Sequence, residues 1–85
     1  MNELDQKISN YMGNKLKQLR TEKGWTQLKT AQQFGVTLQT YRTWEKAKIS
    51  FNTTHLFKIM KAFDISIAVI FENFEEKIGN ADSLQ

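Results

Sequence analysis

The side chains best suited to recognition chemistry lie in one short stretch, residues 38–43, directly after a turn at Gly35. Gln39 and Thr43 are four residues apart, so they share one face if this stretch is a helix. A glutamine can hydrogen-bond N6 and N7 of adenine together, and a threonine offers a hydroxyl and a methyl group to the major groove. On an arbitrary helix such a polar face is usually only solvated. Contact with DNA bases is the alternative.

Two residues beside this pair each allow two interpretations. Arg42 can hydrogen-bond guanine or neutralise a phosphate, and the residue type alone does not decide between them. Leu38 can contact the methyl group of a thymine or pack on Leu28, and packing is slightly favoured.

Charge is distributed unevenly along the chain. The net charge of +3 conceals a basic middle, because residues 13–50 carry +6, residues 51–71 carry +1, and residues 1–12 and 72–85 carry −1 and −3. A basic middle between acidic ends is expected if the middle contacts a polyanion. An ordinary solvated surface is the alternative.

The elements that must position these side chains are all predicted to be helices. The chain has 85 residues, no proline and a hydrophobic fraction of 40%, which fits one soluble globular domain. Apolar residues recur at helical spacing in five segments: 13–24, 26–35, 37–45, 51–64 and 66–79. The β-branched stretch "ISIAVIF" could be a buried strand, but no partner strand is visible, so a helix is preferred. Residues 1–11 are expected to form an N-terminal arm or short extra helix, and residues 79–85 a disordered tail.

Local signals mark where these helices begin and end. Thr26 and Thr37 are good N-caps, because a threonine oxygen can accept a hydrogen bond from the first turn of a helix. Gly24 and Gly35 are the last residues of the first and second segments, where glycine suits a helix end. Only Gly35, Val36 and Thr37 separate the second helix from the third, which requires a sharp bend.

The stretch from Met12 to about Glu72 resembles the helix-turn-helix domain of the lambda-repressor/Cro family, also called the xenobiotic-response-element type. "MGNKLKQLRTEKGWTQ" resembles the first helix of that family, "TQLKTAQQFGVTLQTYRTWE" the helix-turn-helix, and "LFKIMKAFDISIAVIFE" the closing two helices. The resemblance implies an all-α, five-helix DNA-binding domain over residues 12–78, with the helix-turn-helix formed by helices two and three. In such a domain helix two crosses the DNA backbone, and helix three lies in the major groove.

The resemblance also implies roles for single residues. Gln27 matches a glutamine that touches phosphate at the start of helix two, where backbone amides attract anions. Arg20 and Glu45 match a structural ion pair between helix one and the end of helix three. The positions that face base edges on the recognition helix are Leu38, Gln39, Thr40, Arg42 and Thr43.

The sequence departs from the family pattern in several places. Thr30 stands where a core leucine is usual, and Leu28 occupies a position that is usually exposed. Ala47 replaces a glycine that commonly follows helix three. Phe51 stands where proline is frequent, and Leu38 replaces a residue that is usually polar.

Lysines around the motif are expected to contact the phosphate backbone. Lys46 and Lys48 follow helix three, and Lys29 is a weaker candidate on helix two; such contacts give affinity without sequence information. The complete set expected to bind phosphate is Thr26, Gln27, Lys29, Thr37, Lys46 and Lys48. Trp25, Tyr41 and Trp44 could stack on bases, but their helical spacing favours packing in the core.

Other classes of function have little support in the sequence. His55 is the single histidine, cysteine is absent, and no nucleophile motif or metal spacing occurs, so no enzyme activity, cofactor or metal site is predicted. The four glycines form no phosphate-cradling loop. No apolar stretch has the length of a signal peptide or of a membrane span, so a cytoplasmic location is expected.

A homodimer is expected, because one recognition helix contacts few base pairs and a two-fold pair doubles them. The fifth helix is apolar, acidic and remote from the basic middle, so its apolar face is the predicted interface: Ile67, Ile70, Phe71, Phe74 and Ile78. In the alternative, the first three of these residues complete the core of the monomer and Phe74 alone is exposed.

The sequence therefore predicts a transcription regulator that binds double-stranded DNA, most simply a homodimeric repressor. The short chain resembles phage Cro-like repressors, and its closing helices also resemble controller proteins of restriction–modification systems. The rival is an antitoxin-type module that binds DNA and also neutralises a toxin or another protein, with "FENFEEKIG" as the partner surface. A second protein that co-purifies in equal amount would favour that rival.

Overall fold

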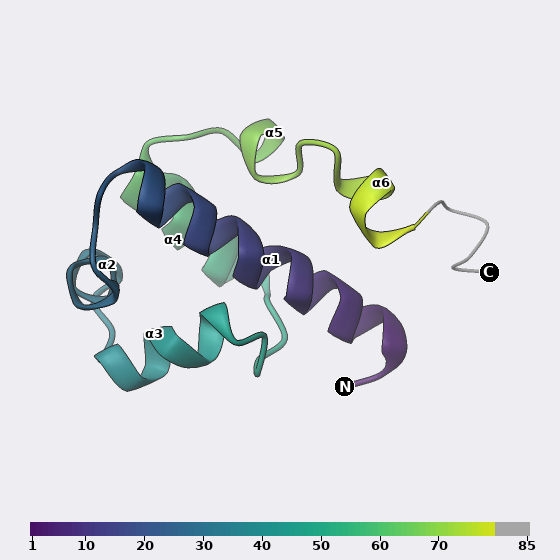
Figure 1. The fold of residues 1–85 in the computed structure, drawn as a ribbon, viewed down its shortest axis with the longest axis horizontal. Coiled ribbons are helices and arrows are strands. Elements are labelled where there is room, and N and C mark those ends of the chain that lie inside the picture. The colour runs from purple at the N-terminus through teal and green to yellow at the C-terminus, as the bar shows by residue number, and fades with distance from the viewer. Residues whose placement is uncertain (80–85) are drawn as a thin grey trace.

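A computed structural model describes residues 1–79 of the chain, and over that range the fold contains six helices and no strand (Figure 1). The expected all-α class is confirmed. The helices are α1 (Glu3–Glu22), α2 (Gln27–Phe34), α3 (Leu38–Glu45), α4 (Thr53–Phe63), α5 (Ile67–Ile70) and α6 (Phe74–Ile78). Of the tail expected at 79–85, all but Gly79 lies outside the described residues.

The first helix is longer than expected. α1 runs without a break for 20 residues, and the side chain of Asn2 caps it by accepting a hydrogen bond from the amide of Asp5 at 2.8 Å. Residues 1–11 therefore form neither an arm nor a separate short helix. The physical reason is that the apolar stripe of Ile8 and Met12 continues into Leu16 with no cap or proline between them.

The expected caps hold the helices that follow. The hydroxyls of Thr26 and Thr37 accept hydrogen bonds from the amides of Lys29 and Thr40, at 3.0 and 3.1 Å. Gly35 ends α2 in the left-handed conformation, with φ 70°, which a residue without Cβ adopts freely. The Val36 amide then reaches back to the Ala31 carbonyl at 3.0 Å, which closes the helix end in a Schellman motif.

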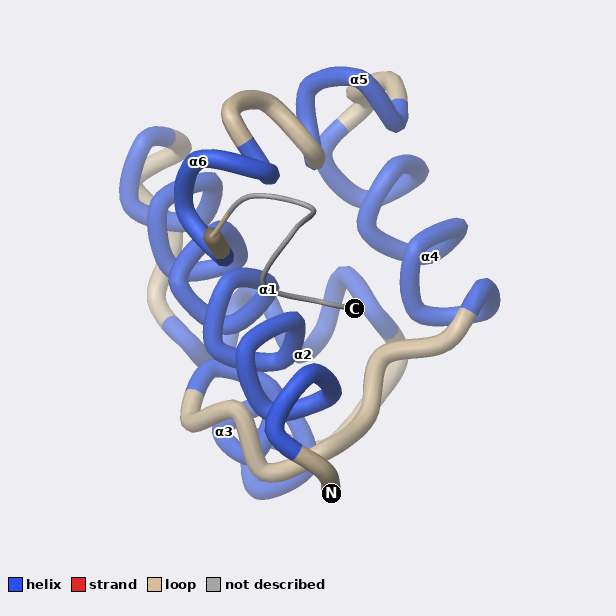
Figure 2. Tube along the Cα trace, turned by 90° about the vertical axis from the view of Figure 1, so that its right-hand side faces the viewer, coloured by secondary structure: helices blue, strands red, loops and turns tan. Residues whose placement is uncertain are grey.

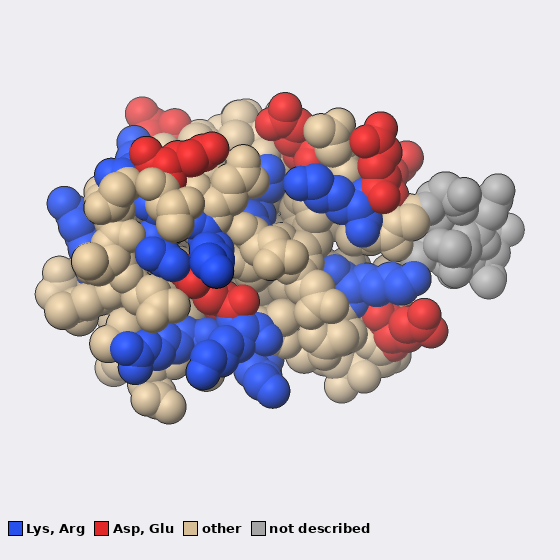
Figure 3. Space-filling view, viewed as in Figure 1, with Lys and Arg blue, Asp and Glu red and all other residues tan. Residues whose placement is uncertain are grey.

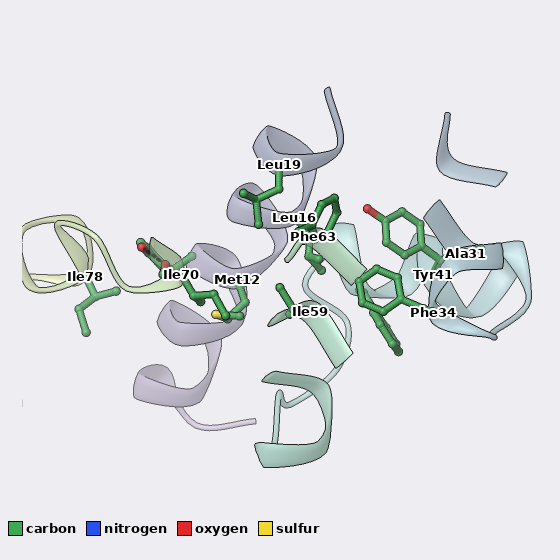
Figure 4. Close-up of a cluster of buried hydrophobic side chains, with 12 residues drawn as sticks. Met12, Leu16, Leu19, Ala31, Phe34, Tyr41, Ile59, Phe63, Ile70 and Ile78 are labelled. Atoms are coloured by element: carbon green, nitrogen blue, oxygen red, sulfur yellow. Dashed lines mark hydrogen bonds between the residues drawn. The ribbon is translucent and has the colours of Figure 1, made fainter. Parts of the chain in front are cut away.

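The core forms one continuous cluster around the inner face of α1. Figure 4 shows side chains from α1, α2, α3 and α4 converging there, and Figure 2 shows α4 and α6 on different sides of α1. Leu16, Tyr41, Ile59 and Ile70 are fully buried. Aromatic rings join the layers, since Phe34 packs edge-on to Trp44 with ring centroids 5.2 Å apart.

The expected fifth helix is interrupted at residues 71–73, so its span holds two short helices. The hydroxyl of Tyr11 donates to the carbonyls of Ile70 and Glu72, at 2.6 and 3.0 Å. In a continuous helix the Ile70 carbonyl would accept from the amide of Phe74, but that amide instead bonds to Phe71 at 3.0 Å. A side chain of α1 therefore breaks the helix that periodicity predicted.

This break changes the face that was expected to be a dimer interface. Ile70 and Ile78 are 0% and 7% exposed, so both belong to the core of the monomer. Phe71 and Phe74 are half-buried, and Phe74 packs edge-on against Tyr11 at 4.9 Å. Of the five residues expected at an interface, Ile67 is the one that is largely exposed, at 51%.

Candidate nucleic-acid interface

The orientation of α3 is fixed by two aromatic residues on its inner face. Tyr41 and Trp44 are 0% and 4% exposed, which confirms their assignment to the core. Trp25, also expected in the core, is half-buried and stacks on Phe63 at 5.2 Å. Because Tyr41 and Trp44 are held inside, the opposite face of α3 must point to solvent.

The outer face of α3 carries the side chains expected to contact bases. Gln39, Thr40 and Arg42 are exposed, while Leu38 and Thr43 are half-buried. The Thr43 hydroxyl donates to the Thr40 carbonyl at 2.6 Å, so the groups it can offer outward are its methyl group and a lone pair. This face therefore presents an amide and a guanidinium at its centre and a methyl group beside them.

Helices α1, α2 and α3 meet at the carboxylate of Glu45. Arg20 reaches it with two nitrogens, Nε at 2.6 Å and a terminal nitrogen at 3.2 Å, as expected for the ion pair. The Tyr41 hydroxyl and the Gln27 amide also donate to it. Arg20 further holds the carbonyl of Trp25 at 3.1 Å, which ties the start of α2 to the same cluster.

The electrostatics of this cluster favour the charged forms of Glu45 and Arg20 and the neutral form of Tyr41. Burial by itself would raise the pKa of Glu45, but the hydrogen bonds from Arg20, Tyr41 and Gln27 outweigh it and hold that pKa below the ordinary 4.5. The hydrogen bond to Glu45 raises the pKa of Arg20, and burial followed by the bond to Glu45 raises the pKa of Tyr41. At neutral pH Glu45 and Arg20 are therefore both charged. We call the cluster of Glu45 with Arg20, Tyr41 and Gln27 the Glu45 joint.

Both polar ends of the Gln27 side chain, which was expected to touch phosphate, are hydrogen-bonded within the protein. Its Nε2 donates to Glu45 at 3.2 Å, and its Oε1 accepts from Nε of Arg42 at 3.3 Å. The side chain thus links the joint to the exposed arginine of α3. The backbone amides at the start of α2 point out of the helix and can still bind an anion.

The other residues expected to bind phosphate surround α3. Thr26, Lys29, Thr37, Lys46 and Lys48 are all exposed. Figure 3 shows Lys and Arg side chains gathered over the region where Figure 1 draws α3, while acidic side chains lie over α5 and α6. The Thr26 and Thr37 hydroxyls are engaged as caps, and the ammonium of Lys29 lies 5.6 Å from the Trp25 ring centroid.

The departures from the family pattern are absorbed locally. Thr30 is fully buried, and its hydroxyl donates to the Thr26 carbonyl at 2.8 Å, so a polar side chain fills the core position without an unmet bond. Leu28 is 52% exposed and so offers Leu38 little burial. Ala47 adopts the left-handed conformation, with φ 59°, where a glycine was expected.

Other chemistry finds little support in the described part of the chain. His55 completes the capping box at the start of α4, with its Nδ1 accepting from the amide of the N-cap Asn52 at 3.0 Å, and its ring packs edge-on to Trp44 at 4.9 Å. Within residues 1–79 no group of three or more histidine, aspartate or glutamate side chains could hold a metal ion. None of the helices over that range is both long and apolar enough to cross a membrane.

Comparison with known proteins agrees with this geometry. Residues 16–70 match the profile of a family described as helix-turn-helix, and the chain belongs to that family, which confirms the resemblance to lambda-repressor/Cro-type domains. No solved structure gives a significant match.

Two curated relatives are both described as uncharacterized HTH-type transcriptional regulators. The relative from Rickettsia conorii is 35% identical over 75 residues, which cover 88% of this chain and 60% of the relative. The relative from Rickettsia prowazekii is also 35% identical over 75 residues, which cover 88% of this chain and 58% of the relative. The chain thus spans about three fifths of the length of these relatives.

Proposed function

We propose that this protein is a homodimeric transcription repressor that binds double-stranded DNA by sequence, with α3 in the major groove. The observation that carries the proposal is the two-sided character of α3: its inner face is locked by Tyr41 and Trp44, and its outer face presents Gln39, Thr40 and Arg42. The helix-turn-helix family and the basic surface around α3 support it. Such a regulator would act on DNA in the cytoplasm.

We divide the proposed DNA-contacting residues into readers, which contact base edges, and holders, which contact phosphates. In this proposal Gln39 bonds adenine, and Arg42, which donates a hydrogen bond to Gln27, bonds guanine or a phosphate. Lys29, Lys46 and Lys48, with the backbone amides that begin α2, hold phosphates on either side of the groove. The Glu45 joint keeps the readers and the start of α2 at a fixed distance from each other.

Selection of bound duplexes from a random pool tests this function. We expect one enriched motif with two-fold symmetry, whose half-sites lie about 34–36 Å apart, because two copies of α3 must enter successive major grooves on one side of the DNA. Absence of any enriched sequence would overturn the proposal.

The Gln39→Ala variant then tests the reader on the selected duplex. Its affinity should fall by about 1–3 kcal/mol and its preference should relax at one base pair, with little change on random DNA. Gln33→Ala, an exposed glutamine on α2, is the matched control and should keep wild-type affinity. Equal loss on both duplexes would remove Gln39 from the readers.

A further inference from the structure

Three residues on one face of α1 meet the segment that follows the recognition helix. Gln6, Ser9 and Gly13 are spaced three and four apart, so they form one line along the helix. All three precede residue 16, where the match to the helix-turn-helix family begins. Opposite them lie backbone carbonyls at the end of α3 and in the loop after it, residues 45–49.

The contacts are close and specific. The Ser9 hydroxyl, in a residue 1% exposed, donates to the Ile49 carbonyl at 2.6 Å. The Gln6 amide donates to the Ala47 carbonyl at 3.2 Å. A methyl group on Gly13 would lie 2.7 Å from the carbonyl oxygen of Glu45, closer than side chains approach, so the absence of a side chain there permits this crossing.

The segment that α1 contacts is strained and carries two cations. Ala47 has φ 59°, a conformation that costs an alanine free energy and persists only where its surroundings hold it. The Lys48 amide bonds back to the Thr43 carbonyl at 2.9 Å, which closes α3. Lys46 and Lys48, on either side of Ala47, are both exposed.

We propose that Gln6, Ser9 and Gly13 are positioning residues that set the place of Lys46 and Lys48 against the DNA backbone. The N-terminal half of α1 acts as a brace, fastening the loop through its carbonyls so that both lysines leave α3 in fixed directions. This inference rests on the proposed function, since the lysines must meet phosphate for their position to matter. Because phosphate contacts carry no sequence information, loosening the brace weakens binding to all duplexes alike.

The first test compares Ser9→Ala and Gln6→Ala with wild type in salt titrations on the selected duplex and on random DNA. Each variant loses one hydrogen bond to the loop, and affinity should fall by about 3- to 10-fold on both duplexes. The slope of log affinity against log salt should decrease by about 1, because a lysine leaves its phosphate. Ser66→Ala, at a serine that makes no cap bond, is the matched control and should change neither quantity.

A double-mutant cycle separates positioning from a general structural effect. If Ser9 acts through the lysines, Ser9→Ala should cost less affinity in a Lys46→Ala/Lys48→Ala background than in wild type. Equal costs in the two backgrounds would overturn the proposal. Gln6→Ala serves as the second variant, because the Gln6 side chain is half-buried and lies outside the core, so this variant should fold as wild type does.

Gly13→Ala tests the close crossing from the other direction. Alanine is the best helix former and glycine one of the poorest, so in an open helix this change raises the melting temperature. Here the added methyl group must push Glu45 and the loop away, so the melting temperature should not rise and affinity should fall on both duplexes. A more stable Gly13→Ala protein with unchanged affinity contradicts the brace.

Hydrogen exchange distinguishes failure of this inference from failure of the proposed function. Ser9→Ala should speed exchange at the amides of Ala47 and Lys48 and leave that of Ile59 unchanged, whether or not DNA is bound. If wild type binds no duplex, the proposed function fails and the lysines lose the role assigned to them. If wild type binds but the Ser9 and Gln6 variants keep its affinity and slope, DNA binding stands and the brace is wrong.

Discussion

Glu45 shows how one side chain of α3 serves the whole motif. It stands at the end of the recognition helix but faces inward, and its side chain is 8% exposed. Arg20 from α1 and Gln27 from α2 both end on it, and Gln27 continues to Arg42. One carboxylate therefore ties three helices together and, through Gln27, holds Arg42, which we propose reads DNA.

Glu45→Gln should destabilise the fold by about 3 kcal/mol, because it leaves the Arg20 charge buried without its counter-ion. A second effect appears in acid. The pKa of Glu45 is lower in the folded chain than the ordinary 4.5. At pH values between the folded pKa and 4.5 the unfolded chain therefore binds more protons than the folded chain, and stability rises with pH. This contribution is complete above about pH 4.5 and is lost as the pH falls through the folded pKa.

Urea unfolding between pH 3 and 7 measures both effects. Wild type should lose stability below about pH 4.5, and Glu45→Gln should start lower and lose less in that range. Glu75→Gln, at an exposed glutamate of α6, is the control and should resemble wild type. If unfolding free energy depended on pH identically in wild type and Glu45→Gln, the stabilising role assigned to ionised Glu45 would be wrong.

For single residues, the sequence predicted well which side chains are exposed, but it did not predict which partners they hydrogen-bond. Tyr41 and Trp44 were predicted inside and Gln39 outside, because helical spacing separates the two faces of α3. That Gln27 links Glu45 to Arg42 could not be predicted, since it depends on how closely α2 and α3 cross. The hydrogen bond from the Tyr41 hydroxyl to Glu45 was not predicted either, although residues four apart in a helix are neighbours and this spacing could have indicated it.

Among the elements, α4 depends on a cap that is sensitive to pH. His55 and Asn52 exchange hydrogen bonds in a capping box, and Nδ1 of His55 must be unprotonated to accept the Asn52 amide. Burial, and then the charge of Lys58, lowers the pKa of His55 below the ordinary 6.5. The stability from this neutral histidine is complete above about pH 6.5 and is lost as the pH falls through the folded pKa.

Wild type should therefore lose about 1 kcal/mol of unfolding free energy between about pH 7 and 5, the size of a lost cap. His55→Gln keeps a side chain that can complete the capping box but does not titrate in this range. Its stability should be flat where that of wild type falls, as thermal unfolding at a series of pH values can show. A wild-type profile that is also flat would contradict the role of His55.

The order and types of the first four helices could be predicted because their periods, caps and stops all agree. Two features could not. The Tyr11 hydroxyl breaks the expected fifth helix from 59 residues away in the sequence, and no local pattern encodes so distant a bond. The first helical segment was predicted to begin at Gly13, whereas in the structure Gly13 lies inside α1 and allows a close crossing.

For the whole molecule, charge and apolar surface are distributed unevenly. Basic side chains gather over α3, and acidic ones lie over α5 and α6 (Figure 3). Beside the acidic face, Ile67 and Val69 of α5 are 51% and 39% exposed. We propose that α5 supplies the dimer contact, with Phe71 and Phe74 beside it rather than at its centre.

Ile67→Glu should convert a dimer to a folded monomer, because it places a charge in each half of a two-fold interface without disturbing the core. Sedimentation should find wild type dimeric and Ile67→Glu monomeric, with weak binding to the selected duplex. Leu4→Glu on α1, where the wild-type leucine is 37% exposed, is the control and should stay dimeric. A monomeric wild type, or a dimeric Ile67→Glu protein, would rule out this surface.

The most direct test of the account is to map where DNA lies on the molecule. Titration of the selected duplex into isotope-labelled protein should shift the amide resonances of α3, the start of α2 and the loop at residues 46–48. The amides of α6 should move little, because they lie on the acidic side. Shifts concentrated on α5 and α6, or none outside the tail, would contradict the claim that α3 reads DNA.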